Sequence, residues 1–470
     1  MRRLTILFLA LLLASFTVIS MPTTAQAHPR FMGVNMAWMN YGADFGSDFY
    51  YPGYGPNYNA STVEGYFADI QSKHMNIVRI WTMEDLCGLS FQNNNADQPC
   101  TGVSQVFINN LVDFVRRANS HGITAYITFL APGDVQKHPN IVTAYRSQFI
   151  YNALVPVAQA LAPYRVCYDI MNECNYSGLG WQDLRNYGND ARIALHNVSP
   201  SWVTMSTDQP SAFGSNFYNT LGGLGFDFYD CHVYSMATSP LTVTPSMAGG
   251  APLFLGEYGP NAGSGWADYS QSSDTATVNN FCNQADSDGY SGMLAWSYVP
   301  GSSFSLQNTN TLWNMEYFGA TWGINTSISS GTYYNVTNVS SGLNLDDTNW
   351  GTNPGNQIDL WDAWGGAPQL WQFNQQGDGS YTLYNQAGGL NLDDPGGSNS
   401  PGQHLQLWPA NGATAQEWRA NLQPDGSYTF TNVAAGLNLD DPYGAGPAGT
   451  LVQLWPGNGA TAQEWNLTQH

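Results

Sequence analysis

The sequence has very few basic side chains: 13 Lys and Arg among 470 residues, against 34 Asp and Glu, for a formal net charge of -21. A surface with this balance repels phosphate backbones and anionic lipid, so we expect neither nucleic acid nor a membrane surface as a partner. Charged residues make up only 10% of the chain and aromatic residues 14%, which excludes a disordered chain. A neutral partner on which aromatic rings can stack, such as a sugar polymer, fits this composition.

Long apolar runs are also scarce, and the longest lies at the N-terminus. Arg2 and Arg3 precede an almost continuously apolar stretch over 4–19, and Ala25-Gln26-Ala27 has the small-x-small pattern of a cleavage site. Residues 1–27 are therefore predicted to be a signal peptide. No other stretch is long and apolar enough to cross a bilayer, so we expect a secreted, monomeric mature protein.

Only six cysteines occur, an even number, which in an exported chain predicts disulfides. Cys87 and Cys100 flank a polar loop and are the predicted pair. The remaining four allow three connectivities, which their spacing does not decide: Cys167, Cys174, Cys231 and Cys282. No CxxC motif or Cys/His cluster is present, so neither a metal nor a cofactor is expected.

The C-terminal part, predicted as a domain over residues 328–470, repeats itself. The segment GLNLDD begins at Gly342, Gly389 and Gly436, and a Gln-x-Trp motif recurs with the same step of 47 residues. Each copy alternates short β runs with Gly, Pro, Asn and Asp turns, without helical periodicity. One copy cannot bury its apolar face alone, so three copies around a pseudo-threefold axis predict a shared core.

Three in-register repeats with one Gln-x-Trp each resemble the ricin B-type β-trefoil, family 13 of the carbohydrate-binding modules. The resemblance implies that the motif tryptophans are core residues and that other side chains bind sugar. In the family, an aspartate accepts hydrogen bonds from sugar hydroxyls, an aromatic residue stacks on the sugar ring and an asparagine supplies an amide. The matching residues here are the aspartates Asp346, Asp393 and Asp440, the aromatic residues Trp361, Trp408 and Trp455, and the asparagines Asn411 and Asn458. The first copy departs from this pattern, with Trp364 where the others have the asparagine.

The N-terminal part, predicted as a domain over residues 28–327, alternates short β runs with amphipathic helical stretches. The predicted strands are 32–38, 76–81, 124–130, 166–173, 202–208, 226–234, 252–258 and 292–298, with helices such as 104–120, 141–161 and 269–287. Eight strands with helical crossovers favour an α/β fold of the (β/α)8 TIM-barrel type. A doubly wound sheet is the competitor, but no Gly-rich phosphate loop follows the first strand.

Two of the five glutamates in this part end a predicted strand. Glu173 closes VCYDIMNE and Glu257 lies in PLFLGEYG. Two carboxylates at one barrel mouth are the minimum needed for glycoside hydrolysis. Asn-Glu on the fourth strand and Glu on the seventh resemble the clan A glycoside hydrolases, family 5 and its relatives. That resemblance implies Glu173 as acid/base, Glu257 as nucleophile, and retention of anomeric configuration.

Further residues match the clan pattern and are predicted to bind substrate or support the glutamates: Arg79, Asn172, His232, Tyr234 and Trp296, with Trp38 and Trp81 as stacking subsites. We expect Arg79 and Tyr234 to keep the pKa of Glu257 low. A more enclosed Glu173 should have a raised pKa. Cys174 stands where family 5 usually has proline, which leaves the family within the clan open.

These observations favour a secreted retaining β-glycosidase, endo-acting on a β-1,4-glucan or β-mannan and targeted by a lectin-like module. Xylan, β-1,3-glucan and galactan are alternative substrates. A non-catalytic lectin with a degenerate barrel is disfavoured because both glutamates are present. His28, exposed by the predicted cleavage, raises the hypothesis of a copper monooxygenase, but such sites need a β-sandwich rather than this β/α pattern.

Overall fold

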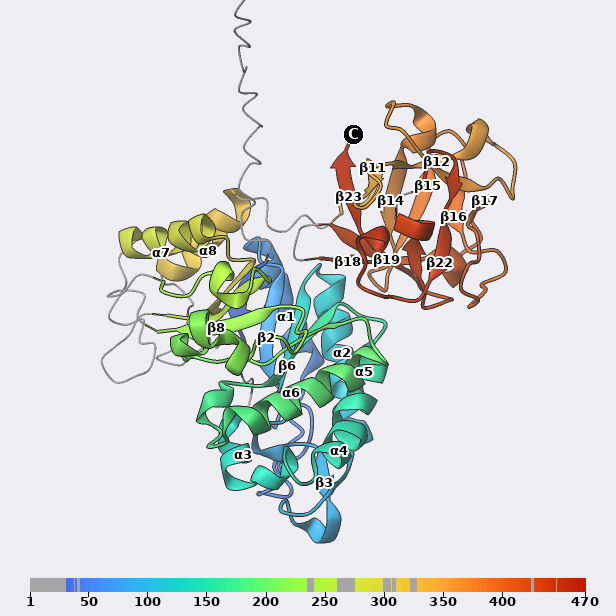
Figure 1. The fold of residues 1–470 in the computed structure, drawn as a ribbon. Helices are drawn as coiled ribbons and strands as arrows, with labels where there is room; N and C mark the ends of the chain where they lie inside the picture. The colour runs from blue at the N-terminus through green and yellow to red at the C-terminus, as the bar shows by residue number, and fades with distance from the viewer. Residues whose placement is uncertain are drawn as a thin grey trace, which may run out of the picture.

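The computed structural model describes residues 31–37, 39, 43–234, 241–259, 275–298, 306, 310–321, 328–423, 427–444 and 446–470. They form two bodies, a barrel of strands and helices and an all-β body (Figure 1). The predicted signal peptide and Trp38 lie outside the described residues. Within the described residues, no helix has the length and apolar character needed to span a membrane.

The barrel contains the eight predicted strands, all parallel, in the order β7-β6-β5-β2-β1-β10-β9-β8. An isolated parallel bridge between Thr207 and Cys231 joins the two ends of this order and closes the barrel. The strands are β1 (Phe31–Asn35), β2 (Ile77–Trp81), β5 (Thr124–Leu130), β6 (Val166–Met171), β7 (Trp202–Thr204), β8 (Tyr229–Val233), β9 (Leu253–Tyr258) and β10 (Gly292–Trp296). The predicted (β/α)8 barrel is confirmed.

Helices surround this sheet, and their sequences explain where they begin and which face they bury. In α2, the Ser104 side chain accepts a hydrogen bond from the Phe107 amide at the N-terminus, and Leu111 and Ala118 lie on the buried face. The helices are α1 (Ala60–Ser72), α2 (Gln105–Ser120), α3 (Pro132–Lys137), α4 (Arg146–Phe149), α5 (Val155–Leu161), α6 (Trp181–His196), α7 (Thr275–Asp288) and α8 (Asn310–Thr321).

The helix predicted over 141–161 is present only from Arg146 onward, and it contains a π turn that the sequence pattern did not predict. The structure has α4, then a π-helical turn η4 (Ile150–Leu154), then α5. Pro156 lies in the first turn of α5 and has no amide hydrogen, so it cannot make the i to i−4 hydrogen bond that would continue α4. The chain accommodates the proline by widening to a π turn just before it.

The predicted disulfide between Cys87 and Cys100 is also wrong, because both cysteines are free and buried. Cys100 begins β4 (Cys100–Val103) of an antiparallel hairpin and pairs with Phe91 of β3 (Leu89–Phe91), whereas Cys87 lies before β3. The prediction rested on the spacing of the two cysteines along the chain, which does not determine how far apart their side chains lie after folding. The other four cysteines are likewise free: Cys167, Cys174, Cys231 and Cys282.

The all-β body is built from the three repeats. Its strands are β11 (Thr332–Asn338), β12 (Asn344–Asp347), β13 (Ile358–Trp361), β14 (Trp371–Gln375), β15 (Tyr381–Asn385), β16 (Asn391–Asp393), β17 (Gln406–Trp408), β18 (Trp418–Leu422), β19 (Tyr428–Asn432), β20 (Asn438–Asp440), β21 (Thr450–Leu451), β22 (Gln453–Trp455) and β23 (Trp465–Gln469). The motif tryptophans Trp371, Trp418 and Trp465 are fully buried in one shared core, as predicted.

This all-β body contacts the barrel at the N-terminal ends of its strands. Leu422 packs against the cluster that contains Phe31 at the start of β1 and Trp202 at the start of β7. The Arg419 guanidinium lies over the Tyr164 ring, 5.5 Å from its centroid. Because all barrel strands are parallel, their C-terminal ends, where the predicted site lies, are at the opposite end of the barrel.

Candidate active site

Arg79, in the middle of β2, is the centre of a buried polar network inside the barrel. Its side chain is completely buried, and Nη1 donates to Glu257 Oε1 at 2.6 Å and to Asn35 Oδ1 at 3.2 Å. Nη2 donates to Asp169 Oδ2 and to Asn172 Oδ1, both at 2.7 Å. One cation therefore fixes four side chains that come from three strands or their ends, β1, β6 and β9.

Glu257, on β9, is held at both carboxylate oxygens. Arg79 contacts Oε1, and the Tyr234 hydroxyl just after β8 donates a short hydrogen bond to Oε2. The residue is only 3% exposed. A carboxylate fixed in this way has one orientation relative to anything that enters the barrel mouth.

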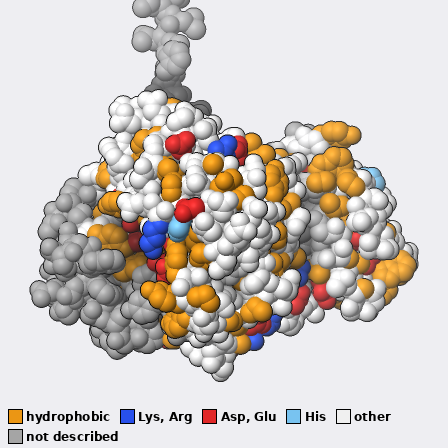
Figure 2. Space-filling view, turned by 90° about the horizontal axis from the view of Figure 1, so that it is seen from below, with side chains coloured by type: hydrophobic (Ala, Val, Ile, Leu, Met, Phe, Trp, Pro, Cys, Tyr) orange, Lys and Arg blue, Asp and Glu red, His pale blue; other side chains and the backbone are white. Residues whose placement is uncertain are grey.

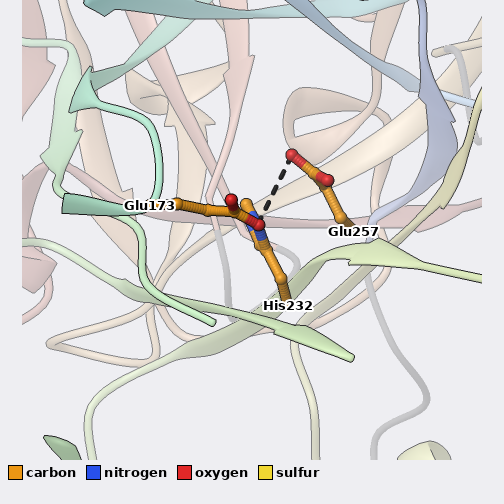
Figure 3. Close-up of side chains that lie close together, drawn as sticks. All are labelled: Glu173, His232 and Glu257. Carbon is orange, nitrogen blue, oxygen red and sulfur yellow. Dashed lines mark hydrogen bonds and ion pairs between the residues drawn. The ribbon is translucent and has the colours of Figure 1, made fainter. Parts of the chain in front are cut away.

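Glu173 follows the end of β6 and lies on the other side of His232. His232 Nδ1 is 2.9 Å from Glu173 Oε1 and 3.4 Å from Glu257 Oε1. Figure 3 shows the three side chains, from three separate elements, pointing toward one another. Glu173 has a left-handed backbone with φ of 38°, and its amide donates to Ser206 Oγ at 3.1 Å, which holds the residue in this unfavourable conformation.

The pKa values differ from those expected from the sequence. Burial raises the pKa of Glu257, and the nearby charges of His232 and Arg79 only partly offset it. Burial also raises the pKa of Glu173, but the hydrogen bond and charge of His232 lower it below the ordinary value. The prediction failed because Glu257, not Glu173, is the more enclosed carboxylate. For His232, burial lowers the pKa, but Glu257, Glu173 and Asp230 together raise it to about 9.

The two carboxylates open into a cleft of about 440 Å³ at the C-terminal ends of the strands. Trp81 and Trp296 line it with their rings perpendicular, 5.0 Å between centroids. Further lining comes from side chains that extend along the mouth: Glu84, Asp85, Asp134, Lys137, Tyr176 and Asp208. Every barrel residue predicted from the sequence, other than Trp38, therefore lies at the cleft or in the network beneath it.

Three members of the network were not predicted: Asn35, Asp169 and Ser206. Asp169 Oδ2 accepts from Arg79 and from the Ser206 hydroxyl, both at 2.7 Å, and the residue is fully buried. A charged residue within the apolar run VCYDIM was the sequence feature that could have revealed it, since a buried carboxylate needs a cationic partner.

The oxygen and nitrogen atoms of Glu173, His232 and Glu257 lie within 4.8 Å of one another, a spacing that could accommodate a metal ion. Each of these groups already has a hydrogen-bond or ionic partner in the site, and the Arg79 cation lies 2.6 Å from Glu257. Both carboxylates and His232 Nδ1 thus have partners within the chain, whereas His232 Nε2 and Arg79 Nε are buried without a hydrogen-bond partner among the described residues.

The all-β body places the three predicted aspartates at equivalent points of its three repeats, and at the third repeat Asp440 and Trp455 line a pocket. In the second, Asp393 is buried and accepts hydrogen bonds from Gln406 and Gln416, at 2.8 and 3.0 Å, beside the exposed ring of Trp408. The third repeats this arrangement with Asp440, Gln453, Gln463 and Trp455. The backbone amides of Ala413 and Ala460 donate to the side-chain oxygens of Asn411 and Asn458, so the same loop hydrogen bond orients both asparagine side chains.

Comparison with known proteins gives separate matches for the two bodies. Residues 309–408 and 414–470 match the family model described as ricin-type beta-trefoil lectin domain-like. The chain is 25% identical over 350 residues to a mannan endo-1,4-beta-mannosidase from Mytilus edulis, covering 62% of this chain and 87% of that protein. It is 24% identical over 339 residues to another from Cryptopygus antarcticus, covering 60% and 84%.

Among solved structures, an endo-1,4-beta-mannanase from Eisenia fetida is 21% identical and covers 62% of this chain and 91% of that chain, with a TM-score of 0.49. The chain thus joins a (β/α)8 barrel, similar in sequence to the mannan endo-1,4-beta-mannosidases, to an all-β domain that matches the model of the ricin-type beta-trefoil lectin domain.

Proposed function

We propose that the protein is a secreted endo-β-mannanase that cleaves β-1,4-mannan with retention of anomeric configuration, and that its trefoil holds it on the polysaccharide. The observation that carries the proposal is the pair of glutamates at the ends of β6 and β9, whose nearest oxygens lie within 4.8 Å of one another. Retaining glycosidases have carboxyl groups about 5–5.5 Å apart, whereas inverting enzymes need a wider gap for water.

Glu257 is the proposed nucleophile. Arg79 and Tyr234 hold its two oxygens, so an ionised carboxylate faces the cleft in a fixed orientation. It attacks the anomeric carbon while Glu173 donates a proton to the departing glycosidic oxygen, which gives a glycosyl-enzyme and a shortened chain. Glu173 then removes a proton from water, and that water releases the sugar from Glu257.

The proton for the first step is shared between Glu173 and His232. With a pKa of about 9, His232 carries a proton that it donates across the 2.9 Å hydrogen bond to Glu173. Transfer along this bond yields neutral His232 and protonated Glu173 without changing the number of bound protons. The pair therefore remains a competent acid well above the pH at which an isolated carboxyl group would lose its proton.

Mannan is proposed as substrate because relatives bearing the name mannan endo-1,4-beta-mannosidase match most of the barrel. The perpendicular pair of Trp81 and Trp296 supplies apolar walls for sugar rings at the cleft. In the trefoil, Asp393 and Asp440, each oriented by two glutamines, are proposed to accept hydrogen bonds from sugar hydroxyls.

The test uses purified protein on β-mannan, with cellulose, xylan, β-1,3-glucan and galactan as comparison substrates. Glu257→Ala should abolish mannan cleavage, and added azide should restore part of it with an inverted product, because azide replaces the missing nucleophile. Glu64→Ala, at a glutamate paired with Arg117 away from the cleft, is the matched control and should retain activity. Preference for another polymer would reject mannan as substrate, and full activity in Glu257→Ala would reject the mechanism.

A further inference from the structure

The first trefoil repeat differs from the other two at several positions between Thr348 and Leu370, and four of them lie on or beside one exposed aromatic surface. With the repeat step of 47 residues, the residues of the first, second and third copies are Trp350, Gly397 and Gly444; Asp359, Gln406 and Gln453; Trp364, Asn411 and Asn458; and Gly366, Ala413 and Ala460. The second and third copies agree with each other at every one of these positions. At these four positions the first repeat has therefore departed from a pattern that the other two share.

Trp350 has a backbone conformation that suits glycine. Its φ is 58°, and the matching glycines of the other repeats, Gly397 and Gly444, both have φ of 64°. A bulky side chain is strained in this left-handed region, whereas glycine is not. The indole is 56% exposed, so burial does not compensate for that strain. A strained residue kept on the surface indicates a functional constraint.

Trp364 forms a pair with Trp350. The ring centroids are 5.3 Å apart at an interplanar angle of 44°, and the Trp364 side chain is 47% exposed. A Cβ atom at Gly366 would lie 2.0 Å from the Trp364 ring, so the alanine of the other repeats would clash there. The glycine makes room for the indole, and the three changes together build one exposed aromatic surface.

Beside this surface, the first repeat has Asp359 in place of the glutamine whose side chain donates to the aspartate in the other two repeats. Asp346 and Asp359 face each other across the β12–β13 ladder, at 7% and 5% exposure. Each has an Oδ1 without a hydrogen-bond partner among the described residues, whereas in the second repeat Gln406 donates to the matching aspartate, Asp393. These two buried acceptors are therefore available to donors from a ligand, as are those of Asp394 and Asp441 in the other repeats.

Trp361, two residues after Asp359 on the same strand, adds a third exposed indole at 44% exposure. The second repeat offers one exposed tryptophan, Trp408, and glycines in the corresponding loop. Three indoles supply more stacking surface than one sugar ring can cover. The carboxylates can accept hydrogen bonds from hydroxyl groups, and the small share of charged residues in the chain, 10%, suits a neutral ligand.

We propose that the first repeat is a polymer-binding subsite, in which Trp350, Trp361 and Trp364 stack on consecutive rings of a polysaccharide chain while Asp346 and Asp359 accept hydrogen bonds from its hydroxyls. The second and third repeats each hold a single sugar. This inference rests on the proposed sugar-binding function of the trefoil and assigns the polymer preference to one of its three sites.

The decisive variant is Trp350→Gly/Trp364→Asn/Gly366→Ala in the full chain, which gives the aromatic surface of the first repeat the residues of the other two and leaves Asp359 unchanged. We expect binding to insoluble mannan to fall about tenfold or more, as for truncation of aromatic anchors, with binding of mannose unchanged. Trp408→Ala, in the second repeat, is the matched control and should reduce mannose binding more than polymer binding. Trp350→Gly alone should raise the melting temperature and still weaken polymer binding, which separates function from misfolding.

All measurements are made with and without EDTA and added calcium, because paired carboxylates can also bind cations. Polymer binding that requires calcium would overturn the proposal in favour of a cation site. Polymer binding unchanged in the triple variant, while Trp408→Ala reduces mannose binding, would refute the first-repeat assignment alone. Wild-type protein that binds neither mannan nor mannose would refute the lectin function and the subsite together.

Discussion

Replacing His232 by asparagine should move the alkaline limit of activity to lower pH. The asparagine amide can occupy the place of Nδ1 and donate to Glu173, but it holds no proton that titrates. In the wild type, the Glu173–His232 pair keeps one proton until the pH passes the His232 pKa of about 9. In the variant, the limit is the pKa of Glu173 itself, so the alkaline limb of kcat/KM should fall by about 2 units or more.

The same change affects stability with a defined sign. The pKa of His232 rises from 6.5 to about 9 on folding, a shift of about 2.5 units that corresponds to about 3 kcal/mol. Because the folded-state pKa is raised, this stabilisation is complete below pH 6.5 and is lost as the pH rises through about 9. The wild type should therefore lose stability over this window, and His232→Asn should not.

The assay combines pH profiles of kcat/KM on a soluble manno-oligosaccharide with denaturant unfolding at pH 6 and 9.5. His196→Asn is the matched control, since His196 also pairs with an aspartate, Asp227, but lies outside the cleft. An alkaline limb at the same pH in wild type and His232→Asn, with normal folding, would refute the shared-proton reasoning.

Three further changes test separate parts of the structure. Arg79→Lys keeps the positive charge but loses the simultaneous contact of the guanidinium with two buried carboxylates, so the free energy of unfolding should fall by about 3 kcal/mol and kcat/KM should fall sharply. Arg146→Lys, at an exposed ion pair, is the control and should lower the free energy of unfolding by less than about 1 kcal/mol. Asp393→Ala/Asp440→Ala should weaken mannose binding by the isolated-sugar sites without changing turnover of short soluble oligosaccharides; an equal loss of turnover would contradict the separation of roles. A reductant should leave the melting temperature unchanged in both the wild type and Cys100→Ser, because Cys100 is free. A melting temperature that a reductant lowers in the wild type but not in Cys100→Ser would show that Cys100 forms a disulfide.

Sequence reasoning identified the two glutamates that meet in the cleft because these residues carry local signals. Glu173 and Glu257 each end an apolar run, and in a parallel barrel the ends of all strands meet at one mouth. The trefoil was equally accessible, since an in-register repeat fixes which tryptophans are buried. In both cases a one-dimensional pattern maps directly onto a position in the fold.

Other features depend on contacts that no local pattern specifies. The Arg79 network joins strands far apart in the chain, so Asn35 and Asp169 could not be assigned to it from spacing. The order of the glutamate pKa values depends on which carboxylate is more enclosed, and this is a property of the assembled cleft. Trp350 could be read only as a loop residue, because its positive φ and its contact with Trp364 appear only in three dimensions.

The measurement that tests the central claim most directly is the anomeric configuration of the first product released from a β-1,4-linked manno-oligosaccharide, followed by proton NMR before mutarotation. With Glu257 as nucleophile and Glu173 as acid/base, whose nearest oxygens lie within 4.8 Å, the account predicts the β-anomer first and cleavage at internal bonds. The α-anomer first, or no hydrolysis of β-mannan by the folded protein, would contradict it.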